Sequence, residues 1–91
     1  MSRFDEELGH RIRGARKAAH LLQCELANMV YLSKASISAY ERATKTPSVE
    51  TVARIAAACG VGISELVPKV ELVPVVDERQ TTIYDYLEDE K

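Results

Sequence analysis

The side chains that could ligate a metal ion or attack a substrate are few and scattered in this sequence. Cys24 and Cys59 lack the C-x-x-C spacing of zinc sites, and His10 and His20 have no metal-ligating neighbours. Glu25 follows Cys24 directly, and a neighbouring carboxylate disfavours a reactive thiolate. The sequence has no glycine-rich phosphate loop and no nucleophile–base arrangement. We therefore predict that the chain is not an enzyme and holds no metal ion or cofactor.

The charged side chains divide the chain into a basic and an acidic half. The formal net charge is −2, but residues 1–47 carry eight Lys/Arg and five Asp/Glu, whereas residues 48–91 carry four and nine. Because nucleic acid is attracted by positive charge, any contacts with DNA are expected in the first half.

The chain shows no signal for export or for a membrane span. Its first residues lack the apolar core of a secretory signal, and no apolar run approaches the roughly 18 residues of a spanning helix. Two cysteines without a pairing pattern are typical of reduced thiols in a cytosol. We expect a cytoplasmic protein with no membrane partner.

Helical periodicity dominates residues 4–67. One face of a first helix is formed by Phe4, Leu8, Ile12, Ala15 and Ala19, at intervals of three and four. Further helices are expected over Gln23–Met29, from a cap at Ser33 to about residue 42, from a cap at Ser48 to Gly60, and over residues 63–67. The buried face of the fourth consists of Val49, Val52, Ile55, Ala56 and Cys59. Since aromatic residues make up only 5% of the chain, the predicted fold class is a compact all-α bundle of five helices with an aliphatic core.

The last part of the chain differs in composition. We predict a helical domain over residues 1–67 and an acidic extension over residues 68–91, which carries seven acidic and three basic residues. Residues 70–76 are rich in valine and predict a short strand, which Pro74 restricts to a sheet edge. Ile83, Tyr84 and Leu87 predict a short helix further on.

The stretch over residues 23–42 resembles the helix-turn-helix of Cro/repressor (XRE-type) transcriptional regulators. Ala27 stands where two helices of the motif cross closely, and the apolar seam between them consists of Leu26, Val30, Leu32 and Ile37. The resemblance continues through residues 8–17 on one side and residues 47–66 on the other. It implies a lambda repressor-like DNA-binding domain that binds double-stranded DNA as a homodimer.

The resemblance also implies a role for individual residues. The helix after Ser33 would lie in the major groove with its leading end on base edges. The predicted base contacts are Lys34, Ala35, Ser36, Ser38 and Ala39. The predicted phosphate contacts are Gln23, Ser33, Arg42, Thr44, Lys45, Thr46, Arg13 and Lys17. Arg16 and Glu41 are implied to pair across the first and third helices as a structural support.

Several positions depart from the family pattern. His20, Tyr31 and Ala43 stand where the family commonly has glycine, so a positive φ there would be strained. Leu22 replaces the Ser or Thr that usually caps the second helix. The helix after Ser33 is also poor in Arg, Asn and Gln, so specificity would rest partly on DNA shape.

Two functions remain open at this point. The first is a homodimeric operator-binding regulator, either a repressor or a controller protein, in a bacterial cytosol or a phage-infected cell. Its dimer contacts are expected from Ile63, Leu66 and Val67, or from the strand that contains Leu72. The second is an antitoxin or anti-regulator whose acidic residues 70–91 bind a partner protein.

Overall fold

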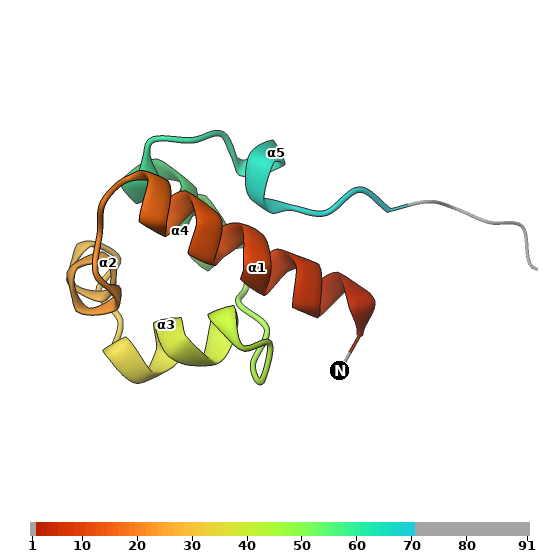
Figure 1. Ribbon diagram of the computed structural model, residues 1–91, viewed down its shortest axis with the longest axis horizontal. Coiled ribbons are helices and arrows are strands. Elements are labelled where there is room, and N and C mark those ends of the chain that lie inside the picture. Colours follow the sequence, from red (N-terminus) through yellow and green to blue (C-terminus); the bar gives the residue numbers. More distant parts are fainter. Residues whose placement is uncertain (1, 71–91) are drawn as a thin grey trace, which may run out of the picture.

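The computed structural model describes residues 2–70 of the chain. These residues form five helices: α1 (Arg3–Ala18), α2 (Gln23–Met29), α3 (Lys34–Glu41), α4 (Val49–Cys59) and α5 (Ile63–Leu66) (Figure 1). The predicted all-α bundle is confirmed for this part of the chain, and the helix bounds agree to within one or two residues. The predicted strand after residue 70 and the helix beyond it lie outside the described residues.

Serine side chains begin three of the five helices. Ser2, Ser33 and Ser48 each accept a hydrogen bond from the backbone N–H three residues further on, at 3.1 to 3.2 Å. As predicted, Leu22 gives α2 no side-chain cap. Instead, the backbone N–H of Leu22 donates to Glu25 Oε1 at 2.8 Å, which fixes the chain at the start of α2.

The first four helices end in the same left-handed turn. The residues with positive φ are His20 (59°), Tyr31 (59°), Ala43 (60°) and Gly60 (74°). After each of them, the next backbone N–H bonds to a carbonyl five residues back, as Leu32 N–H does to Ala27 O at 2.9 Å. The predicted strain at the three non-glycine positions is therefore present, at a cost of roughly 1–2 kcal/mol for each residue.

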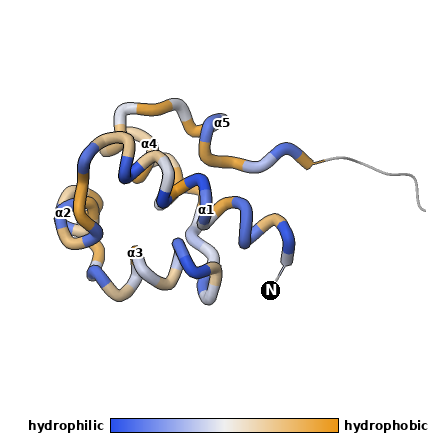
Figure 2. Tube along the Cα trace, in the orientation of Figure 1, coloured by the Kyte–Doolittle hydropathy of each residue, from blue (hydrophilic) through white to orange (hydrophobic). Residues whose placement is uncertain are grey.

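The core is aliphatic apart from one tyrosine. It consists of Leu8, Ile12, Leu26, Ala27, Val30, Ile37, Tyr40, Val52, Ile55, Ala56 and Leu66. Hydrophobic and hydrophilic residues follow each other along the helices, as the colours of the Cα trace show (Figure 2). The prediction that Val49 is buried is wrong, because its side chain is 78% exposed and the buried side of α4 begins only at Val52.

A glycine lets α1 and α3 approach each other closely. A Cβ atom at Gly9 would lie 2.8 Å from the backbone carbonyl oxygen of Glu41 and closer still to that of Tyr40. Any side chain at this position would push the two backbones apart. Gly9 thus sets how closely the last turn of α3 lies on α1.

The left-handed turn between α2 and α3 gives a first test. We expect Tyr31→Gly to raise the free energy of unfolding by about 1 kcal/mol, because glycine removes the left-handed penalty, partly offset by its larger unfolded-state entropy. The tyrosine ring is 85% exposed, so little packing is lost. Gly60→Ala, at the matching turn after α4, should lower stability. Urea denaturation with an unchanged m-value measures both, and no gain for Tyr31→Gly would contradict strain at this turn.

Candidate nucleic-acid interface

α2 and α3 pack directly on each other and are joined by residues 30–33 (Figure 1). Leu26, Ala27, Val30 and Ile37 belong to the buried core, and Leu32 is half-buried against the same core. The small side chain of Ala27, 2% exposed, allows the two helices to lie close. The apolar residues expected to form the seam are therefore buried or half-buried.

The leading residues of α3 lie outside the core. Lys34 and Ala35 are exposed, and Ser36, Ser38 and Ala39 are half-buried. Because Ile37 and Tyr40 face the core, the opposite side of α3 presents residues 34, 35, 38 and 39 to solvent. All five residues predicted to contact bases thus keep some exposure in the monomer.

Two of the α3 serines are engaged in local hydrogen bonds. Ser33 Oγ donates to Ser36 Oγ at 3.1 Å and also accepts from the Ser36 backbone N–H. Ser38 Oγ accepts from Arg42 Nε at 3.1 Å. This bond holds the Arg42 guanidinium back along α3 and leaves its two terminal amino groups for other partners.

The residues predicted to contact phosphates are exposed, with the exception of half-buried Gln23. Arg13 and Lys17 follow Gly9 at intervals of four, so they share the side of α1 that meets α3. Thr44 Oγ1 donates to Ala39 O at 3.2 Å, and Thr46 Oγ1 donates to Asp5 Oδ1 at 3.0 Å. Exposed positive side chains therefore lie on α1, at Arg13 and Lys17, and in the loop after α3, at Lys45.

A buried ion pair links these elements. Arg16 Nε and Nη2 donate to the two carboxylate oxygens of Glu41 at 2.6 and 3.1 Å, and the side chains of Arg16 and Glu41 are 10% and 4% exposed. The third nitrogen of the guanidinium, Nη1, donates to Leu21 O at 2.8 Å. Gln23 Nε2 also donates to Glu41, at 3.1 Å, and retains a second N–H. The pair implied by the resemblance thus joins α1, α2 and α3 at one carboxylate.

Two pKa values follow from this arrangement. The hydrogen bonds to Glu41 raise the pKa of the Arg16 guanidinium, and they outweigh the opposing effect of burial. Arg16 is therefore charged at neutral pH. Burial raises the pKa of the nearby Cys59 thiol, which keeps it protonated and unreactive at neutral pH.

The residues predicted to form a dimer contact differ in their exposure to solvent. Ile63 is 40% exposed and Val67 38%, so both offer apolar surface. Leu66 is 1% exposed, because α5 has a single turn and this residue faces the monomer core. The prediction that Leu66 lies at a dimer surface is therefore wrong, and Leu72 lies outside the described residues.

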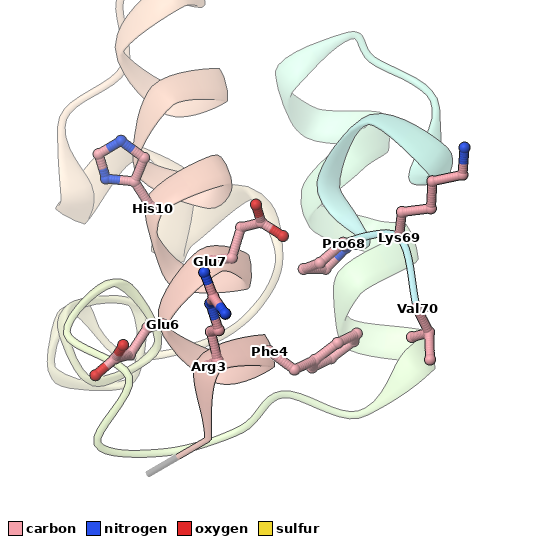
Figure 3. A pocket seen from close by; sticks show the side chains of 8 residues that line it. All are labelled: Arg3, Phe4, Glu6, Glu7, His10, Pro68, Lys69 and Val70. Atoms are coloured by element: carbon pink, nitrogen blue, oxygen red, sulfur yellow. The ribbon is translucent and has the colours of Figure 1, made fainter. Parts of the chain in front are cut away.

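An open pocket of about 890 Å³ lies between α1 and residues 68–70 (Figure 3). Its lining residues are Arg3, Phe4, Glu6, Glu7, His10, Pro68, Lys69 and Val70. None of the residues predicted to contact DNA lines this pocket. Within residues 2–70, no group of His, Cys, Asp or Glu side chains is placed to hold a metal ion, and no helix is long and apolar enough to cross a membrane.

Two short helices joined by a tight turn, with an exposed leading face on the second and three supporting helices, define a helix-turn-helix domain. The helix-turn-helix (HTH_3) family model matches residues 12–66, and the chain belongs to this family. Over 57 residues it is 42% identical to the cryptic phage CTXphi transcriptional repressor RstR of Vibrio cholerae. That match covers 63% of the chain and 51% of RstR, so the chain spans about half the length of this curated relative.

Solved structures share the fold. The restriction-modification controller protein C.AhdI from Aeromonas hydrophila aligns with a TM-score of 0.65 and 28% identity, over 67% of this chain and 92% of its own. The P22 c2 repressor, crystallised with a synthetic operator, aligns with a TM-score of 0.62 and 32% identity, over 66% and 91%.

The buried ion pair gives a second test. Removing one partner leaves a buried charge uncompensated, so we expect Glu41→Ala to lower the free energy of unfolding by about 3 kcal/mol. Arg54→Ala is the control, because it breaks an exposed pair with Glu50 at 2.8 Å and should cost less than about 1 kcal/mol. Equal losses for the two variants in urea denaturation would show that burial of the Arg16–Glu41 pair does not matter.

Proposed function

We propose that the chain is a transcriptional regulator that binds a specific site in double-stranded DNA, with α3 in the major groove. The observation that carries this proposal is the exposed leading face of α3, held on α1 by the Arg16–Glu41 pair. Two relatives support it, since RstR is a phage repressor and the P22 c2 repressor was solved on an operator. We propose a repressor or controller role on the same grounds, in a bacterial cytosol or a phage-infected cell.

The proposed base contacts follow from the chemistry of the exposed α3 residues. The Lys34 ammonium can donate to guanine O6 or N7, and Ala35 and Ala39 can contact a thymine methyl group. Ser36 and Ser38 can bond to either kind of base edge, but both already hold local partners. Lys34 is therefore the residue from which we expect the strongest base preference.

The proposed phosphate contacts come from α1, from the start of α2 and from the residues that flank α3 in sequence. Four of them are cations, Arg13, Lys17, Arg42 and Lys45, and each neutralised phosphate contributes about −0.9 to the slope of log K against log salt. Four such contacts would give a slope of about −3.6 for each half-site. Gln23, Ser33 and Thr44 can add hydrogen bonds that fix the register of the protein on the duplex.

We propose a homodimer that binds two half-sites about 34 Å apart, one turn of the DNA helix. The exposed side chains of Ile63 and Val67 offer the apolar surface for such a dimer.

A second candidate function, an antitoxin or anti-regulator, is favoured by the acidic composition of residues 68–91. The two functions are compatible, because one uses the helical domain and the other the extension. Membership of a regulator family favours the prediction that the chain is not an enzyme.

Selection from random duplexes at fixed salt, followed by gel shift, tests the proposal directly. We expect a two-fold-symmetric site, and failure to bind any duplex at low salt would refute the function.

On the selected site, Lys34→Ala should cost roughly 1–3 kcal/mol of binding free energy and relax the preference at one base pair. If the loss were the same on unrelated duplexes, Lys34 would not read a base.

Lys45 gives the complementary prediction. Lys45→Ala should weaken binding to all duplexes about equally, because a phosphate contact carries no sequence information. The slope of log K against log salt should become shallower by about 0.9. A titration at several salt concentrations measures this, and an unchanged slope would count against a phosphate contact by Lys45.

A further inference from the structure

A hydrogen bond joins the start of α1 to the loop that follows α3. Thr46 Oγ1 donates to Asp5 Oδ1 at 3.0 Å, across 41 residues of sequence. The other carboxylate oxygen, Oδ2, accepts from Ser2 Oγ at 2.9 Å, and Ser2 also caps α1. Both oxygens of Asp5 are therefore engaged, one with its own helix and one with the loop.

This contact decides what the Thr46 hydroxyl can do. A threonine hydroxyl has one proton to donate, and phosphate oxygens are acceptors that need that proton. The proton of Thr46 is already given to a carboxylate, and this carboxylate would repel a phosphate brought to the same place. The hydrogen bond from Ser2, followed in size by that from Thr46, lowers the pKa of the Asp5 carboxyl. Asp5 is therefore a charged hydrogen-bond acceptor at neutral pH.

The loop is held on both sides of Lys45. On one side, the backbone N–H and the hydroxyl of Thr44 both donate to Ala39 O, at 2.9 and 3.2 Å. On the other side, Thr46 is tied to Asp5. Lys45 lies between these two points and is exposed.

We propose that Asp5 and Thr46 form an anchor that fixes the loop on α1, so that Thr46 positions Lys45 for a DNA phosphate and does not contact the DNA itself. This rests on the proposed function and replaces the phosphate role expected for Thr46. Asp5, which no sequence motif marked for binding, becomes a positioning residue of the DNA-binding surface.

A double-mutant cycle separates the anchor from a direct contact. In the wild-type background, Thr46→Val should weaken DNA affinity roughly two- to tenfold, the range for one lost hydrogen bond. In an Asp5→Ala background, Thr46→Val should change the affinity no further, because the bond is already gone. Thr46→Ser keeps the donor and should retain wild-type affinity. An equal loss in both backgrounds would show a direct phosphate contact, and no loss in either would show that the loop needs no anchor.

Two controls complete the experiment. Glu6→Ala removes an exposed carboxylate from the same turn of α1 and reports the effect of charge alone on affinity. The same cycle measured as urea unfolding needs no DNA. Asp5→Ala should lose more stability than Thr46→Val, because it also removes the bond from Ser2, and the double variant should lose no more than Asp5→Ala alone. If the chain bound no duplex, the proposed function would fail, whereas additive unfolding losses would overturn the anchor.

Discussion

The position of α3 depends on one buried ion pair, between Arg16 and Glu41. α3 has only eight residues and buries two large side chains, Ile37 and Tyr40, so its stability depends on tertiary contacts. Glu41 adds a polar constraint to this packing, since it accepts hydrogen bonds from α1 and from the start of α2 at the same time. A buried pair is weak evidence for net stability, and we infer that this one serves the orientation of α3 on α1.

Gly9 makes that geometry attainable. The ion pair requires the last turn of α3 to lie against α1, and only a residue without Cβ leaves room for the carbonyl oxygens there. The left-handed turns after the first four helices then direct the chain back to the core, and they have a steric cost at His20, Tyr31 and Ala43. The residues that follow these turns, Leu21 and Leu32 among them, pack against the core and offset part of that cost.

The local features of the fold could be predicted from the sequence, because short-range chemistry determines them. The caps at Ser33 and Ser48 depend on a few neighbouring residues, whereas the positive φ at His20, Tyr31 and Ala43 was expected only from the resemblance to the family. The predictions for Val49 and Leu66 were wrong, because hydrophobic periodicity shows which face of a helix is apolar but not where its buried part begins or ends. Val49 precedes the buried part of α4, and α5 is too short to show which of its residues points inward. The Arg16–Glu41 pair came from resemblance alone. The hydrogen bonds Gln23–Glu41 and Asp5–Thr46 could not be predicted, because they join polar residues that are far apart in sequence and follow no periodic pattern. The hydrogen bond between Ser38 and Arg42 could have been expected, because the two residues have the helical spacing of four.

The local bonding of α3 bears on how the proposed regulator would recognise its site. Ser36 shares its hydroxyl with the cap residue Ser33, and Ser38 accepts from Arg42, so neither side chain is fully available to a base edge. In the proposed complex, direct readout would fall mainly to Lys34 and to methyl contacts, which distinguish few base pairs. Discrimination would then come largely from the shape and deformability of the DNA, which a protein senses through the positions of phosphates. Such readout requires phosphate-binding groups at fixed distances from the recognition helix. The fixed position of α3 on α1, and the tie between Asp5 and Thr46 on the loop that carries Lys45, meet that requirement.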